Sequence, residues 1–155
     1  MFKTMRRIDR QVTNDETIKI LEKCEYGVLS MVNQDNYPYG VPISYVYKDG
    51  CIYFHSAVEG YKLDNIAANS KVSFCVVGRK KSLPEKFTTS YESVIAFGEA
   101  SQVSGQEKRD ALLALIAKYA PEHMEKGKEY IHASEDKTIV VKIAVNHMTG
   151  KVRPQ

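Results

Sequence analysis

Cysteine is scarce in this sequence, and its spacing predicts neither a disulfide framework nor a metal site. Among 155 residues there are three cysteines, Cys24, Cys51 and Cys75, without any C-x-x-C pair. An odd number of widely spaced cysteines fits buried, reduced thiols better than disulfides or metal ligands. The four histidines also lack the spacing of a metal-binding motif. We therefore expect no bound metal.

Long apolar runs and a strong excess of one charge are also missing. No stretch is long enough to span a membrane, and residues 1–7 contain no apolar core of a signal peptide. The formal net charge is only +3, from 22 basic and 19 acidic residues. Composition therefore gives no indication of a nucleic-acid or membrane partner, and we expect a cytoplasmic protein.

Present instead is a series of strand patterns separated by polar turns. Alternating apolar residues predict six strands, over residues 26–32, 41–47, 51–54, 71–78, 91–103 and 138–145. The turn Lys48-Asp49-Gly50 joins two of them as a tight hairpin, and Gly98 predicts a bulge. Residues 79–90 are predicted as a surface loop and residues 1–12 as an N-terminal arm. The last strand is predicted to end at Val145, before a polar tail that begins at Asn146.

Helical spacing appears at four places. It predicts helices over residues 13–23, 61–68 and 104–119, and a short charged one over 122–131. Thr13 with Glu16, and Ser104 with Glu107, have the spacing of capping boxes. In the third helix, Leu112, Leu115, Ile116 and Tyr119 would face a core. Antiparallel strands with peripheral helices indicate one domain over residues 1–155, mainly β, with an α+β β-barrel architecture.

The stretch from Tyr37 to Asn69 carries the candidate chemistry. His55 and Ser56 end a strand, Gly60 allows close backbone approach, and Lys62 lies in the first turn of a helix. Unpaired N–H groups at a helix start, a hydroxyl and a cation together suit a phosphate monoester. The alternative is a surface turn with a solvated lysine, and spacing alone favours it, because short phosphate motifs match by chance.

Several segments together resemble the FMN-binding split-barrel superfamily, whose fold is that of pyridoxamine 5′-phosphate oxidase, and in particular its nitroimidazole-resistance (Nim) branch. The matching segments, in order, are 5–7 (MRR), 37–42 (YPYGVP), 53–66 (YFHSAVEGYKLDNI), 93–100 (SVIAFGEA) and 147–151 (HMTGK). They extend over nearly the whole chain. The resemblance implies a six-stranded antiparallel Greek-key split barrel.

The resemblance also implies an FMN site. Positions matching Val41, Pro42, Ile43 and Ser44 present backbone to the flavin ring in the family. Positions matching His55, Ser56 and Lys62 hold the FMN phosphate beside Gly60. Tyr61 stands where relatives often carry a second cation, which implies a weaker phosphate clamp here.

The resemblance further implies a homodimer with the flavin in the cleft between two barrels. We expect the second subunit to contribute polar contacts from the segment 91–93, which includes Ser93. A simple strand start that meets water is the alternative for Ser93.

An FMN-dependent oxidoreductase or flavin-reductase-like protein acting on a small molecule is the leading functional hypothesis. His55 is the single, weak candidate for a catalytic residue, and phosphate contact is its more common role. The alternative is a non-catalytic FMN carrier or a haem-binding relative of the same fold. No Arg-x-His pair lies near the C-terminus, which disfavours pyridoxamine phosphate oxidase activity itself. The substrate and the electron donor remain open.

Overall fold

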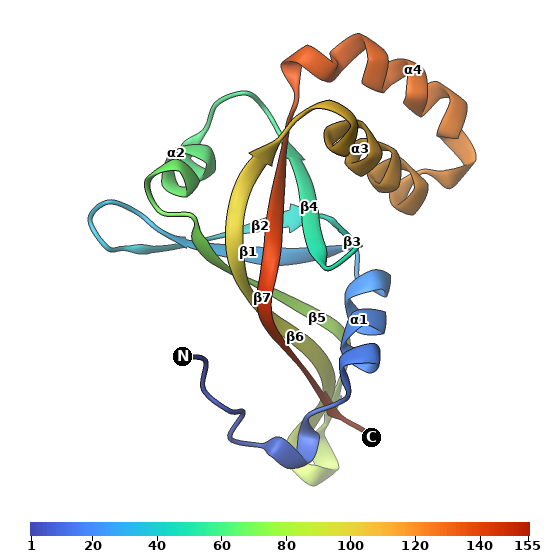
Figure 1. The fold of residues 1–155 in the computed structure, drawn as a ribbon. Coiled ribbons are helices and arrows are strands. Elements are labelled where there is room, and N and C mark those ends of the chain that lie inside the picture. The colour runs from blue at the N-terminus through green and yellow to red at the C-terminus, as the bar shows by residue number, and fades with distance from the viewer.

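One antiparallel sheet of seven strands organises the chain, which a computed structural model describes over residues 1–155 (Figure 1). The strand order is β2-β1-β5-β6-β7-β4-β3. The strands are β1 (Tyr26–Val32), β2 (Pro38–Ser44), β3 (Val46–Lys48), β4 (Cys51–Ser56), β5 (Lys71–Leu83), β6 (Thr88–Val103) and β7 (Ile139–Arg153). The helices are α1 (Asn14–Lys23), α2 (Tyr61–Ala68), α3 (Gly105–Tyr119) and α4 (Met124–Ser134). The prediction of a mainly antiparallel β architecture with peripheral helices is confirmed.

The chain closes the barrel at Tyr45. Strands β2 and β3 lie at opposite ends of the strand order, yet Tyr45 alone separates them in sequence. The Tyr45 N–H donates to the Tyr119 hydroxyl (2.9 Å), and that hydroxyl donates to the Tyr45 carbonyl (2.6 Å). Because these backbone groups bind a side chain instead of a neighbouring strand, the single strand predicted over 41–47 is divided into two. Six predicted strands thus become seven.

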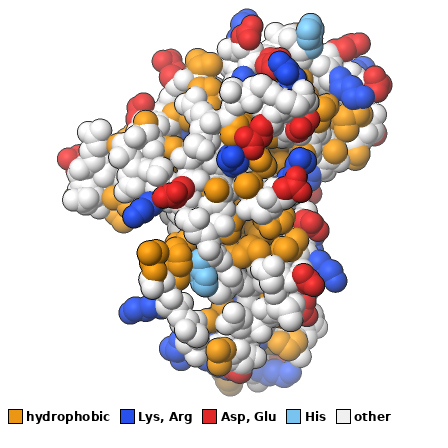
Figure 2. All heavy atoms as spheres, viewed as in Figure 1, with side chains coloured by type: hydrophobic (Ala, Val, Ile, Leu, Met, Phe, Trp, Pro, Cys, Tyr) orange, Lys and Arg blue, Asp and Glu red, His pale blue; other side chains and the backbone are white.

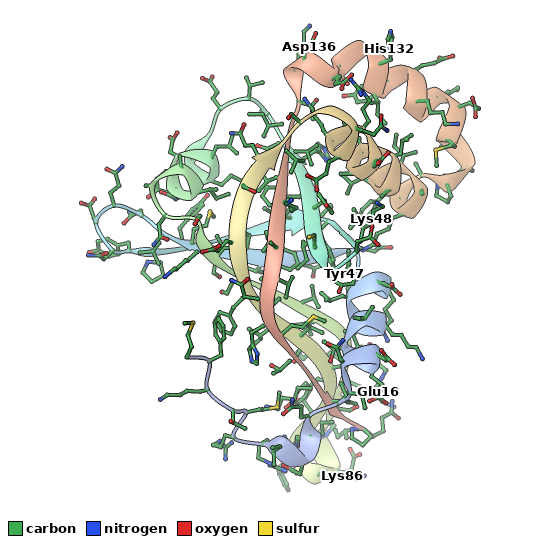
Figure 3. All side chains as sticks on the ribbon, viewed as in Figure 1. Glu16, Tyr47, Lys48, Lys86, His132 and Asp136 are labelled. Carbon is green, nitrogen blue, oxygen red and sulfur yellow. The ribbon has the colours of Figure 1, made fainter.

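Two long strands continue beyond the ends that the sequence predicts. The predicted loop 79–90 is wrong, because β5 runs to Leu83 and pairs with a β6 that begins at Thr88. The predicted end of the last strand at Val145 is also wrong, because β7 continues to Arg153 opposite Tyr91 of β6. The side chains of these segments are largely polar, so the sequence lacks the alternating apolar pattern that predicts a strand. Their backbone hydrogen bonds come from partners far away in sequence. Lys86 marks the tip of the β5–β6 hairpin, at the opposite end of the molecule from His132 on α4 and Asp136 in the turn after it (Figure 3).

Two local predictions about backbone shape are confirmed. The register of β6 against β7 shifts between Phe97 and Gly98, as expected for a bulge. A Cβ at Gly98 would collide with the Ala144 carbonyl, so only glycine permits this close strand approach. Asp49 and Gly50 both have positive φ (51° and 78°), which gives the predicted tight turn between β3 and β4.

The helices differ in how they begin. Thr13 and Glu16 form the predicted capping box of α1. The box predicted at Ser104 is wrong, because Ser104 makes no side-chain cap to α3. Glu107 instead accepts a hydrogen bond from the Tyr53 hydroxyl (2.9 Å), so a contact with β4 replaces the local cap. No helix is both long and apolar enough to cross a bilayer.

Two apolar clusters occupy opposite faces of the sheet around β4. Ile52 and Phe54 belong to the larger cluster, which fills the barrel and includes side chains of α1 and α2. Tyr53 belongs to a smaller cluster, which joins the outer face of β4 to α3 and α4. Figure 2 shows hydrophobic side chains gathered about the middle of the molecule, with charges of both signs scattered over both ends.

Candidate functional site

The end of β4 presents two polar side chains to opposite faces of the sheet. Ser56 continues the inward series of Ile52 and Phe54 and is buried, at 7% exposure. His55 follows Tyr53 on the outer face and is exposed. Successive side chains of a strand alternate between faces, so the structure separates two residues that the sequence hypothesis assigned to one phosphate.

Helix α2 begins directly after a short turn from Ser56. Its N-cap is Gly60, with φ at 153°, and no side chain caps the helix. The N–H groups of Leu63 and Asp64 both donate to the Gly60 carbonyl (3.1 Å each). The N–H groups of Tyr61 and Lys62 have no partner within the helix, as for any first turn. This predicted helix is confirmed from Tyr61 to Ala68.

This helix start suits an anion. A Cβ placed at Gly60 would meet nothing within 4 Å, so the backbone is open to an approaching group. Lys62 is half-buried in the first helical turn, and Ser56 precedes the turn from β4. Free N–H groups, a cation and a hydroxyl are the donors that a phosphate monoester requires.

Strand β2 offers a free edge. It pairs with β1 along one side and is the last strand of the sheet order on its other side. Ile43 is buried, and Val41 packs partly against the barrel core. Pro42 and Ser44 are exposed, and Pro42 has no N–H to donate. The predicted backbone platform 41–44 is therefore accessible along one side.

A second feature, absent from the sequence hypothesis, is a largely apolar cavity of 420 Å³ between the barrel and the helices α3 and α4. Its polar wall includes Ser44 and His55, and its apolar wall includes Leu112, Leu115 and Ile116. Tyr119 also lines it, and burial raises the pKa of this phenol. The helical spacing of apolar residues in α3 predicts that these side chains face a core. In the structure, part of that helix face lines the cavity.

Tyr61 begins α2 directly before Lys62, whereas Ser93 lies on β6. The Tyr61 hydroxyl accepts a hydrogen bond from the Asn33 amide (2.8 Å), and its ring meets the Tyr39 ring edge-on at 4.8 Å. Ser93 pairs with Lys151 of β7, whereas Ser56 pairs with Ile139 at the start of that strand. Within one chain, Ser93 is therefore distant from Ser56.

Comparison with known proteins gives a family match over most of the chain. The family model described as pyridoxamine 5′-phosphate oxidase matches residues 13–152. No curated protein sequence matches the chain.

Solved structures share the fold at low sequence identity. A candidate 5-nitroimidazole antibiotic resistance protein from Bacteroides thetaiotaomicron superposes with a TM-score of 0.76 at 22% identity, covering 92% of this chain and 86% of that one. An FAD-binding protein from Mesorhizobium loti superposes with a TM-score of 0.67 at 20% identity, covering 91% of this chain and 93% of that one. An FAD and heme binding protein from Mycobacterium smegmatis superposes with a TM-score of 0.82 at 16% identity, covering 94% of this chain and 74% of that one. These similarities confirm the split-barrel fold.

Proposed function

The chain belongs to the pyridoxamine 5′-phosphate oxidase family, and we propose that it is an FMN-binding oxidoreductase acting on a small molecule, related to the nitroimidazole-resistance proteins. The observation that carries the proposal is the uncapped start of α2, which combines Gly60 and Lys62 with the buried Ser56 of β4. These groups bind the flavin phosphate. The free edge of β2, over residues 41–44, holds the flavin ring.

A bound flavin would supply the hydride or electron transfer, which no side chain of this chain provides. The protein's own residues bind and orient. Lys62 and the first N–H groups of α2 neutralise the phosphate, and Ser56 donates a hydrogen bond to it. The residues present fit this group, because the helix start has no side-chain cap that would compete with an anion.

The cavity beside Ser44 and His55 is where we place the substrate. It lies against the same strand end as the flavin platform, because Ser44 belongs to both. Its wall from α3 and α4 is largely apolar, so it accommodates an apolar molecule and limits water. His55 supplies the only imidazole of that wall, and an imidazole can donate or accept a hydrogen bond to a bound molecule. We therefore assign His55 to substrate contact.

A flavin carrier without turnover, or a haem-binding protein, is the alternative. A histidine facing an apolar cavity favours haem, and one structural neighbour is described as binding FAD and heme.

We also propose that the protein is a homodimer. Exposed apolar side chains continue across neighbouring strands on the outer face of the sheet, where Val28 lies opposite Cys75 and Cys75 opposite Ile95. Val77 is 59% exposed and pairs with Ser93 on the same face. Covering this face with a second barrel would remove apolar surface from water and place Ser93 at the interface.

Absorbance of the purified protein tests the proposal directly. Flavin bands, together with oxidation of a reduced nicotinamide in the presence of substrate candidates, would support an oxidoreductase. Flavin bands without any turnover would support the carrier, and a Soret band would support haem. A colourless protein that binds no added flavin would contradict the proposed function.

A further inference from the structure

We propose that Tyr119 of α3 is a positioning residue, whose hydroxyl fixes the backbone at the end of the flavin platform and so sets the placement of the flavin ring. This role rests on the proposed flavin site, because it takes residues 41–44 of β2 as the support of the ring. Tyr119 acts through Tyr45, which directly follows the platform in sequence.

The backbone at Tyr45 belongs to no strand pairing. The pairing of β2 with β1 ends at Ser44, and the pairing of β3 with β4 begins at Val46. Tyr45 is fully buried, and buried N–H and C=O groups almost always have a hydrogen-bond partner. The Tyr119 hydroxyl is the partner of both groups, at 2.9 Å from the Tyr45 nitrogen and 2.6 Å from the Tyr45 carbonyl oxygen. A side chain of α3 therefore supports this backbone where a strand is missing.

The same hydroxyl contacts the chain that leads into β1. It forms a hydrogen bond with the Glu25 carbonyl, and the next residue, Tyr26, pairs with Ser44 of β2. A hydroxyl has one hydrogen to donate, so the carbonyls of Glu25 and Tyr45 share it. The Tyr119 hydroxyl thus lies where β1, the platform strand and β3 meet, and its loss would release the end of the platform.

The side chain of Tyr45 is held independently of Tyr119. Its hydroxyl donates to the Leu21 carbonyl of α1, and the Lys118 ammonium lies 4.0 Å from the centre of its ring. The Phe74 ring meets the Tyr45 ring edge-on at 4.9 Å. Loss of the Tyr119 hydroxyl should therefore free the backbone at Tyr45 while its ring stays in the core.

Tyr119 also connects the platform with the cavity in which we place the substrate. Its ring lines this cavity together with Ser44, the last platform residue. A molecule in the cavity can therefore contact the ring whose hydroxyl holds the platform. Because an error of about 1 Å in the placement of reacting groups can lower a rate by about a hundredfold, a contact that fixes one group relative to the other is valuable to the reaction.

Tyr119→Phe removes the hydroxyl and keeps the ring. In this variant of the full chain, we expect hydrogen exchange of the Tyr45 amide, followed by NMR, to become about tenfold faster, the effect of one lost hydrogen bond. FMN should bind about three- to tenfold more weakly in a fluorescence titration, and the visible absorbance bands of bound FMN should shift. Tyr37→Phe, at a tyrosine that is 72% exposed between β1 and β2, is the matched control and should change none of these quantities.

Unchanged exchange at Tyr45 would overturn the inference. So would faster exchange with the affinity and spectrum of FMN unaltered, because a merely structural contact would affect the amide alone. Either result leaves the proposed flavin site intact. A wild type that binds no FMN would instead overturn the proposed function itself.

A second measurement uses the wild type and does not depend on the stability of the variant. We expect FMN to slow exchange of the Tyr45 amide more than exchange of the β7 amides, because binding along residues 41–44 restricts the adjoining backbone. Equal slowing of both would reflect general stabilisation of the fold and would overturn the inference.

Discussion

The side chains of His55 and Ser56, adjacent in sequence, point to opposite faces of strand β4. Ser56 is buried on the barrel side and precedes the turn to α2, whereas His55 lines the cavity under α3 and α4. A single phosphate could therefore bind both side chains only if the strand end bent. We therefore propose that Ser56 contacts the cofactor and His55 the substrate.

Substitution of Lys62 tests the phosphate site. We predict that Lys62→Ala weakens FMN binding by about 1.5–3 kcal/mol, the usual contribution of a charge-assisted hydrogen bond. Fluorescence titration of FMN measures the change. Lys48→Ala is a suitable control, because Lys48 is exposed and pairs with Asp49 on the distant β3–β4 turn. An unchanged affinity for FMN in Lys62→Ala would remove Lys62 from the site.

The division between His55 and Ser56 predicts different effects for two neighbouring alanine variants. Ser56→Ala should weaken flavin binding by about 1 kcal/mol, through loss of one hydrogen bond. His55→Ala should leave the flavin affinity unchanged and lower turnover, because the imidazole that contacts the substrate is lost. Flavin titration and steady-state kinetics separate the two roles. A large loss of flavin affinity in His55→Ala would instead show that His55 belongs to the phosphate site.

The exposed apolar face of the sheet predicts a dimer, and a charged side chain introduced on that face should disrupt it. Light scattering at micromolar concentration should give twice the chain mass of 17.5 kDa. Ile95→Lys should shift the protein toward the monomer, because Ile95 is 44% exposed in the single chain and would be covered in the dimer. Lys81→Glu, on the β5–β6 hairpin, is a control for altered surface charge. A wild-type monomer that binds flavin tightly would contradict the shared cleft.

Mixed dimers test whether Ser93 reaches the flavin of the partner. If each site combines Lys62 from one chain with Ser93 from the other, a dimer of Lys62→Ala and Ser93→Ala chains contains one intact and one doubly altered site. Titration should then find one tight flavin site per mixed dimer. Two sites that each lack one of the two side chains, and no intact site, would place both residues on the same chain's side of the cleft.

Glu92 predicts part of the acid sensitivity of the fold. Burial would raise the pKa of Glu92, but the Arg79 N–H (2.9 Å) and Lys23 lower the pKa below its usual value. A carboxyl whose pKa is lower in the folded state stabilises the fold above the unfolded pKa, and that contribution is lost as pH falls through the folded pKa. Wild type should therefore exceed Glu92→Gln in unfolding free energy by about 2 kcal/mol at pH 7.

The difference should shrink below pH 4.5, the ordinary pKa of a glutamate side chain, because the pKa of Glu92 in the folded protein is lower than this. Urea unfolding at pH 7, 5, 4 and 3 measures it. Glu85→Gln, at the exposed tip of the β5–β6 hairpin, is the control. A difference that stays constant over this pH range would show that Glu92 does not act through its charge.

Local sequence determined those features that neighbouring residues settle among themselves. The Thr13–Glu16 capping box, the bounds of α2 and the turn at Asp49 and Gly50 all depend on residues within a few positions of one another. The alternation of apolar residues likewise fixed the mainly antiparallel architecture. The motifs around His55 and Lys62 indicated the family, which the match over residues 13–152 confirms.

Tertiary structure decided the features that depend on contacts between segments far apart in sequence. Residues 79–83 and 146–153 are strands because β6 supplies their hydrogen-bonding partners, although their side chains are largely polar. The Glu107 carboxylate does not form the predicted local cap, because it accepts a hydrogen bond from the hydroxyl of Tyr53, which is far away in sequence. The cavity that joins Ser44 and His55 to α3 exists only once the helices pack on the barrel. A short sequence window contains none of these partners, so only the folded chain brings them together.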